Sequence, residues 1–162
     1  MYENLVGKKK GFLLESYDKN YDRYTFFGAE PEEIITSRGN ALVITAADGT
    51  ETIREGNPLE LLKEYYSDFE IVKDADGIHF PGGLVGNLGY DFVRYTEQLP
   101  DDNPDEIGIE TIQMMLMTHF VMVDHVAETL TAVALEADDE DGRKAAEQAI
   151  EKMIEAVRTK TK

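Results

Sequence analysis

Closely spaced turn signals constrain the first 55 residues more than any other feature of the chain. Two polar runs, Asp18-Lys19-Asn20 and Arg38-Gly39-Asn40, and the pair Asp48-Gly49 divide this stretch into short segments. The segments are rich in apolar, aromatic and β-branched residues, as strands are. Glycine supplies the positive φ that tight hairpin turns require. We therefore predict a meander of strands over 12–16, 23–27, 33–37, 41–46 and 50–55.

Helix signals begin at residue 57. Asn57 can cap a helix, Pro58 suits its first position, and Glu60 can complete a capping box. The helix is predicted to run to about residue 67. The apolar side chains that it is expected to bury are Leu59, Leu62 and Tyr66.

The second half of the chain also contains both helix and strand signals. We predict a short helix over 90–99, strands over 111–125 and 129–137, and a C-terminal amphipathic helix. Because the strands come in runs with helices between the groups, this order indicates an α+β fold, mainly antiparallel sheet with a few packed helices. The 162 residues, 42% of them hydrophobic, suffice for one core and are too few for two. A single domain over 1–162 is therefore predicted.

Charge and composition exclude several classes of partner. The chain has 33 Asp and Glu against 16 Lys and Arg, a formal charge of −17, which repels nucleic acid. Its longest apolar-rich run, residues 112–123, is shorter than the ~20 residues that a membrane span requires, so no membrane partner is expected. The absence of cysteine excludes disulfides and suits a reducing cytoplasm.

The side chains that carry chemistry are too scattered to form a catalytic or metal site. If residues 111–125 are one strand, His119 and His125 lie roughly 20 Å apart, at ~3.3 Å per residue, and cannot share a metal ion. Asp124 and His125 are interpreted as a polar pair at a strand end, because neighbouring strand residues point to opposite faces. We predict no catalytic residue, metal site or cofactor in this chain.

Three glycines, Gly83, Gly86 and Gly89, recur at a fixed spacing. The spacing differs from that of a dinucleotide-binding fingerprint, and no Walker lysine accompanies it. A residue without a Cβ lets two backbones approach closely. We therefore interpret the motif as close backbone packing.

Glu15 interrupts an otherwise apolar segment. If it is buried, its carboxylate needs a partner, because an unpaired buried charge is costly. One interpretation is a salt bridge to Arg23 on the next strand. The other is a ligand site in which Glu15 meets a cation, Ser16 forms a hydrogen bond and Arg23 meets an anion, with Tyr21 or Tyr24 against a ring. An amino acid with an aromatic side chain has all of these parts.

Five segments carry a resemblance to a known family. They are Phe12-Leu13-Leu14-Glu15-Ser16-Tyr17, Arg23-Tyr24-Thr25-Phe26-Phe27-Gly28, Asn57-Pro58-Leu59-Glu60, the glycine-rich run 82–100 and the strand region 117–125. In this order they resemble anthranilate synthase component I, over about residues 12–137. The glycine-rich run is the most specific of the five, although Asn87 stands where the family has a tyrosine.

The resemblance implies an N-terminal regulatory domain, one half of the component I fold, without the catalytic chorismate-binding domain. In that family the large subunit converts chorismate to anthranilate with ammonia from a glutamine amidotransferase subunit, and tryptophan inhibits it. The catalytic domain, and not this one, uses Mg²⁺. The implied partners are tryptophan, the amidotransferase subunit and the catalytic domain, in the cytoplasm, and this chain alone is expected to be inactive.

The resemblance also implies a tryptophan site on the first two strands. The residues assigned to it are Leu14, Glu15, Ser16, Tyr21, Arg23 and Tyr24. Two alternatives stay open: the N-terminal domain of aminodeoxychorismate synthase component I, which shares the fold, and a stand-alone ligand-binding module. Apolar strand surface that would meet the second domain also makes self-association an expectation.

Overall fold

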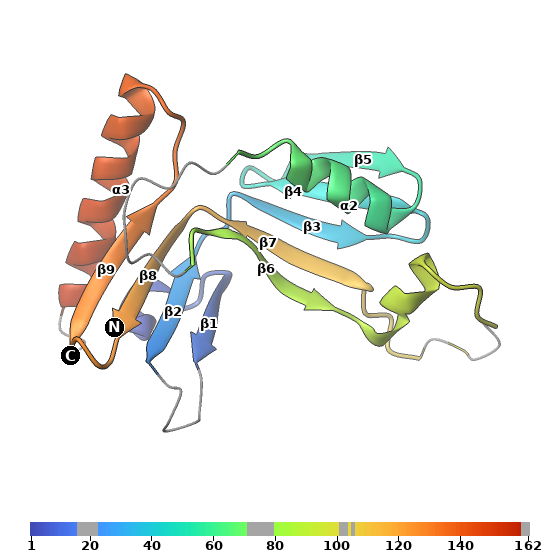
Figure 1. The fold of residues 1–162 in the computed structure, drawn as a ribbon, viewed down its shortest axis with the longest axis horizontal. Helices are drawn as coiled ribbons and strands as arrows, with labels where there is room; N and C mark the ends of the chain where they lie inside the picture. The colour runs from blue at the N-terminus through green and yellow to red at the C-terminus, as the bar shows by residue number, and fades with distance from the viewer. Residues whose placement is uncertain (16–22, 71–79, 101–103, 105, 160–162) are drawn as a thin grey trace. The chain divides into compact units, whose positions relative to one another are not determined.

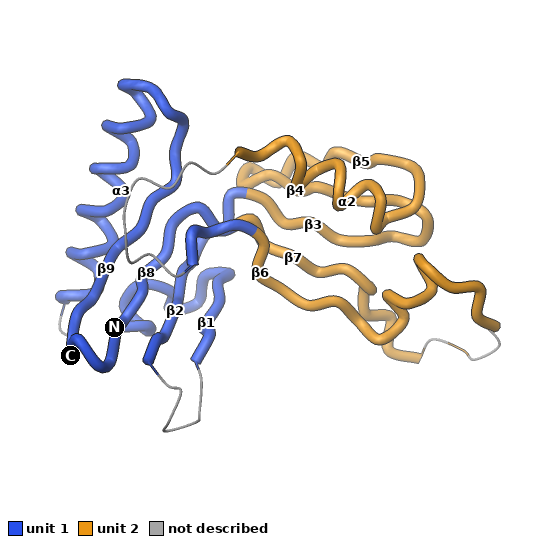
Figure 2. Tube along the Cα trace, in the orientation of Figure 1, with its two compact units in different colours: residues 1–32, 80–83, 117–162 blue, residues 33–79, 84–116 orange. Residues whose placement is uncertain are grey.

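The computed structural model describes residues 1–15, 23–70, 80–100, 104 and 106–159 (Figure 1). These residues form two compact units (Figure 2). Unit 1 contains residues 1–32, 80–83 and 117–162, and unit 2 contains 33–79 and 84–116. Each unit is built on its own mainly antiparallel sheet with few helices, so the predicted α+β class is confirmed. The single domain over 1–162 stays a prediction.

Unit 1 is a four-stranded antiparallel sheet covered by helices. Its strand order is β1-β2-β8-β9. The helices α1 and α3 contact each other, and they pack on β2, β8 and β9. A buried cluster of Phe27, Val121 and Met153 joins the sheet to α3. The elements are α1 (Tyr2–Leu5), β1 (Gly11–Glu15), β2 (Tyr24–Ala29), β8 (His119–Asp124), β9 (Thr129–Ala134) and α3 (Glu140–Arg158).

The sequence of α3 explains both where it starts and which side it buries. The side chain of Asp139 accepts a hydrogen bond from the backbone N–H of Gly142, which satisfies one of the free donors of the first turn. The predicted apolar face is confirmed, with Met153 buried and Ile150 and Val157 packed beside it. No helix in the described ranges combines the length and the apolarity that crossing a membrane requires.

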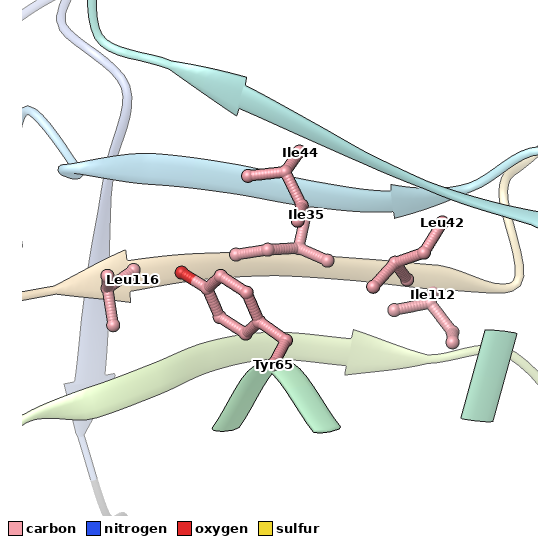
Figure 3. Packing of buried hydrophobic residues seen from close by; sticks show 6 residues of the cluster. All are labelled: Ile35, Leu42, Ile44, Tyr65, Ile112 and Leu116. Carbon is pink, nitrogen blue, oxygen red and sulfur yellow. The ribbon is translucent and has the colours of Figure 1, made fainter. Parts of the chain in front are cut away.

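Unit 2 is a five-stranded sheet in the order β5-β4-β3-β7-β6. Its core lies between the sheet and α2, where Ile35, Leu42, Ile44, Tyr65, Ile112 and Leu116 pack together (Figure 3). The elements are β3 (Glu33–Ser37), β4 (Ala41–Ala46), β5 (Glu51–Glu55), α2 (Pro58–Ser67), β6 (Gly83–Leu88), the 3₁₀ helix η1 (Tyr90–Tyr95) and β7 (Ile112–Met117).

The helix α2 begins as predicted, and Leu62 packs against the core as predicted, but Tyr66 does not. The side chain of Asn57 accepts hydrogen bonds from the N–H groups of Leu59 and Glu60, so the cap is confirmed. Tyr65 is buried, however, whereas Tyr66 is 44% exposed. Tyr65 reaches the core because its hydroxyl donates a hydrogen bond to Glu33 at the start of β3. A tyrosine hydroxyl can be buried when it has a hydrogen-bond partner. The spacing of apolar residues along the helix does not reveal that Glu33, on another strand, provides this partner for Tyr65.

The predicted strand over 111–125 is two strands that belong to different sheets. β7 ends at Met117 and pairs with β3, whereas β8 begins at His119 and pairs with β2 and β9. At Thr118, between them, the carbonyl accepts a hydrogen bond from the N–H of Leu135. The break coincides with Thr118 and His119, two polar residues that interrupt the apolar-rich run over 112–123. Two adjacent polar residues do not by themselves distinguish one long strand from two.

The glycine motif lies in and after β6, an additional strand. A Cβ on Gly86 would meet the carbonyl oxygen of Gln113 and lie 2.8 Å from the Cα of Met114. Close backbone packing is therefore confirmed at Gly86. At Gly89 the nearest atoms belong to Thr111, at 3.5 Å, which is an ordinary van der Waals distance. Two of the three glycines of the motif thus differ: Gly86 is closely packed and Gly89 has room for a side chain.

This difference gives a matched pair of variants. We expect Gly86→Ala to lower the free energy of unfolding by at least about 2 kcal/mol, because backbone atoms of β7 cannot yield to the new methyl group. Gly89→Ala should change it by less than about 1 kcal/mol. Urea denaturation followed by circular dichroism measures both values. Equal losses in the two variants would contradict the assignment of close packing to Gly86.

Candidate effector-binding site

Four of the residues that the sequence assigns to a ligand site lie in or directly next to β1 and β2 of the unit 1 sheet. Leu14 and Glu15 end β1, which is the edge strand of that sheet among the described residues. Arg23 directly precedes β2, and Tyr24 is the first residue of that strand. Ser16 and Tyr21 fall outside the residues that the structure describes. Four of the six predicted positions can therefore be placed.

Strand register divides three of these positions, Leu14, Glu15 and Tyr24, between the two faces of the sheet. Leu14 pairs with Phe26, and Glu15 pairs with Thr25. Because side chains alternate along a strand, Leu14, Tyr24 and Phe26 share one face of the sheet, and Glu15 and Thr25 share the other. A site that uses both Leu14 and Glu15 has to reach around the edge of β1.

Glu15 differs from the expectation of a buried carboxylate. The residue is exposed, and within the described ranges its side chain forms no hydrogen bond or ion pair. The predicted salt bridge to Arg23 is absent from the structure, because Arg23 binds another carboxylate. An exposed glutamate keeps its hydration and needs no internal partner.

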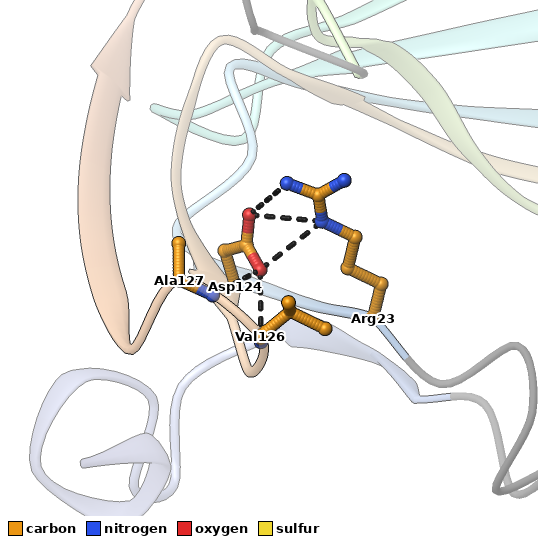
Figure 4. Close-up of polar contacts among 4 residues, drawn as sticks. All are labelled: Arg23, Asp124, Val126 and Ala127. Atoms are coloured by element: carbon orange, nitrogen blue, oxygen red, sulfur yellow. Dashed lines mark hydrogen bonds and ion pairs between the residues drawn. The ribbon is translucent and has the colours of Figure 1, made fainter.

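The partner of Arg23 is Asp124, at the end of β8 (Figure 4). Nη2 of Arg23 donates to Oδ2 of Asp124 at 2.9 Å, and Nε lies 3.1 and 3.2 Å from the two carboxylate oxygens. The Asp124 side chain is only 9% exposed, whereas that of Arg23 is 52% exposed. One side of the Arg23 guanidinium therefore faces solvent, while Nε and Nη2 on the other side donate hydrogen bonds to a buried carboxylate.

Asp124 also holds the turn that joins β8 to β9. Its Oδ1 accepts hydrogen bonds from the N–H groups of Val126 and Ala127, each at 3.0 Å. Hydrogen bonds from Arg23, and then from these amides, hold the pKa of Asp124 at about 2, below its ordinary value of 3.8. The sequence placed Asp124 at a strand end but did not reveal its partner.

Aromatic side chains extend from Arg23 across one face of the sheet. The guanidinium carbon of Arg23 lies 5.0 Å from the centre of the Tyr24 ring, a cation–π distance. The Tyr24 and Phe26 ring centres are 6.1 Å apart, and Phe26 is 5.7 Å from Phe80. Leu14, opposite Phe26 in the register, is 45% exposed. Apolar surface and a fixed cation thus lie side by side at this end of the sheet.

The two described histidines, His119 and His125, make separate contacts. Nε2 of His119 lies 2.8 Å from a carboxylate oxygen of Glu136, and Nε2 of His125 lies 2.8 Å from the Thr25 hydroxyl. Within the ranges that the structure describes, no three His, Asp or Glu side chains gather closely enough to hold a metal ion.

Several known proteins are similar to this chain over most of its length. Anthranilate synthase component 1 of Acetivibrio thermocellus is 31% identical over 121 residues, 74% of this chain and 24% of that protein. The Mycolicibacterium smegmatis protein of the same name is 33% identical over 82% of the chain and 26% of its own length. The Pseudomonas aeruginosa protein of that name is 28% identical over 98% of this chain and 33% of its own length. No family model matches.

The fold has a counterpart among solved structures. The crystal structure of anthranilate synthase component I from Streptococcus pneumoniae superimposes with a TM-score of 0.69 at 22% identity, covering 99% of this chain and 34% of that one. The chain is therefore an α+β domain of the type found in that enzyme subunit.

Sequence and fold together identify it as a homologue of the N-terminal domain of anthranilate synthase component 1. It spans about a quarter to a third of the length of these relatives.

The low pKa of Asp124 predicts a specific dependence of stability on pH. The unfolded chain takes up the proton near pH 3.8, before the folded protein does, so the stabilisation by this carboxylate is complete only above about pH 5 and is lost as the pH falls through 3.8 toward 2. We expect Asp124→Asn to melt at a lower temperature than the unchanged protein at pH 7, with the gap closing near pH 2.

Circular dichroism melts at several pH values test this expectation, and the difference between the two proteins cancels the other carboxylates. Asp48→Asn is the comparison for a carboxylate without an arginine partner among the described residues. Hydrogen bonds chiefly from Thr50 lower the pKa of Asp48, so the contribution of the ion pair is the difference between the two variants. A melting difference for Asp124→Asn that stays constant from pH 7 to pH 2 would contradict the assigned ion pair.

Proposed function

We propose that this chain is the regulatory, tryptophan-binding domain of an anthranilate synthase component 1. The observation that carries the proposal is the similarity of 74 to 98% of the chain to proteins of that name. The complete enzyme would convert chorismate to anthranilate with ammonia from a glutamine amidotransferase subunit, in the cytoplasm. The fold match at a TM-score of 0.69 supports the same parent.

The arrangement around β1 and β2 supports an effector role. A bound tryptophan has an ammonium group, a carboxylate and a large apolar ring. Glu15 offers an exposed negative charge, and Leu14, Tyr24 and Arg23 offer apolar and planar surface on the other side of the edge strand. Ser16 and Tyr21 belong to the same proposal. Since this surface is open, the catalytic domain would supply the remaining walls, and binding by this chain alone should be weak.

Inhibition follows from unequal binding to two arrangements of the complete enzyme. A ligand that binds both arrangements equally shifts neither, however tightly it binds. Tryptophan held between this domain and the catalytic one would favour the arrangement in which both contact it. The exposed Leu13 and Leu14, at 43 and 45%, support a second surface at this edge, either the catalytic domain or another copy of the chain.

The reaction itself is assigned to the catalytic domain. Chorismate carries two carboxylates, and holding both away from water calls for clustered basic side chains or a metal ion. This chain has a formal charge of −17, which opposes dianion binding. The Mg²⁺ that the reaction would use is therefore placed in the catalytic domain under this proposal.

Tryptophan binding is testable with the chain alone. In an NMR titration with L-tryptophan we expect saturable shifts at the amides of Leu14, Glu15 and Tyr24, with a Kd of about 1 mM or weaker. Glu15→Gln should weaken binding by about threefold to tenfold, because the ammonium loses its charged partner. Glu55→Gln, at the exposed end of edge strand β5, is the matched control. Equal affinities for both variants would remove Glu15 from the site, and an absence of shifts in the unchanged chain would contradict the proposal.

Catalysis gives an independent check. The chain incubated with chorismate, ammonia and Mg²⁺ should produce no anthranilate, as followed by the fluorescence of the product. A complete component 1 from a related organism is the positive control. Repeatable formation of anthranilate that rises with the concentration of this chain would overturn its assignment as a regulatory domain.

A further inference from the structure

Asp124 forms more contacts than the end of a strand requires. The two N–H groups of the turn would be satisfied by one oxygen of an asparagine or an aspartate. The carboxylate additionally receives three hydrogen-bond contacts from Arg23, between 2.9 and 3.2 Å. These further contacts account for its negative charge, and they involve a residue that sequence and register place beside the proposed effector site.

Arg23 would be mobile without this partner. Its side chain is 52% exposed, and a free arginine retains about 2 kcal/mol of rotamer entropy. The carboxylate of Asp124, on a buried side chain, fixes both Nε and Nη2 and leaves the guanidinium over the Tyr24 ring. Within the described part of the chain, Nη1 donates no hydrogen bond. Among the described residues, one edge of this fixed, planar group is therefore unpaired, and the side chain is 52% exposed.

The pairing also changes what Arg23 can do for a ligand. A neighbouring carboxylate cancels most of the positive charge at a distance, so Arg23 is a poor long-range attractor of anions. A planar donor and stacking surface do not depend on net charge. Lysine at this position would keep the charge but lose both the fork and the plane. Arg23 would therefore contribute to ligand binding through its planar shape and its hydrogen-bond donors more than through its positive charge.

Resting on the function proposed above, we infer that Asp124 is a positioning residue of the effector site, which fixes the Arg23 guanidinium over Tyr24 so that it meets the effector as a rigid planar donor. Asp124 does not itself touch the effector. Its influence passes through Arg23, and the effector class remains an amino acid with an aromatic side chain.

The variant Asp124→Asn separates this role from the turn. Asparagine keeps an oxygen that accepts the hydrogen bonds from Val126 and Ala127, but it loses the charge that holds Arg23. We expect Asp124→Asn and Arg23→Lys each to weaken L-tryptophan binding by about threefold to tenfold in the same NMR titration, and the double variant to be no weaker than either single one. Asp48→Asn, which makes the same chemical change at a turn in unit 2, should leave the affinity unchanged.

A direct structural readout accompanies the affinities. The Nε–H of Arg23 should give a separate NMR signal, protected from exchange with water in the unchanged protein and lost in Asp124→Asn. A purely structural role for Asp124 would lower the melting temperature without altering the Kd of the folded protein. Tryptophan binding that is the same in Asp124→Asn, Arg23→Lys and the unchanged chain would overturn this inference and leave the proposed function standing. Failure of the unchanged chain to bind would overturn both.

Discussion

The carboxylate of Asp124 connects three segments of the unit 1 sheet: the end of β8, the turn to β9 and the residue that precedes β2. Asp124 ends β8, accepts from the turn that leads to β9, and binds the arginine that opens β2. Its side chain is buried, so a loss of either set of donors would leave a desolvated charge in place. The position of Arg23 over Tyr24, and hence the character of the surface beside β1, follows from this contact.

Local chemistry made much of the fold predictable. The cap at Asn57, the turns around Gly39 and Gly49, and the apolar face of α3 each depend on residues within one or two turns of each other. The failures are of another kind. The break falls where Thr118 and His119 interrupt an apolar-rich run, but nothing in that run shows that its two halves pair in different sheets. Contacts between distant segments decide such features, and short-range patterns do not contain them.

The candidate site shows the same limit. Sequence reasoning brought Leu14, Glu15, Arg23 and Tyr24 to two neighbouring strands, which the structure confirms. One of its two interpretations paired Arg23 with Glu15, which is close in sequence, whereas the structure pairs Arg23 with the distant Asp124. That interpretation depended on a buried Glu15, and the edge position of β1 among the described residues leaves Glu15 exposed. An edge strand has no neighbour to cover its outer side, and this follows from the strand order, not from the residues of the strand itself.

The strand order β1-β2-β8-β9 has a consequence for how the protein is made. In unit 2, β3, β4, β5 and α2 are consecutive, so they need only short loops to close and can associate as soon as they leave the ribosome. In unit 1, β2 can pair with β8 only after about 100 more residues have been synthesised, because the contact between Arg23 and Asp124 spans 101 residues. The N-terminal strands of unit 1 are thus synthesised first, but their sheet is completed only when β8 has been synthesised. During that interval the apolar side chains of β2 that β8 and α3 later cover stay exposed to water.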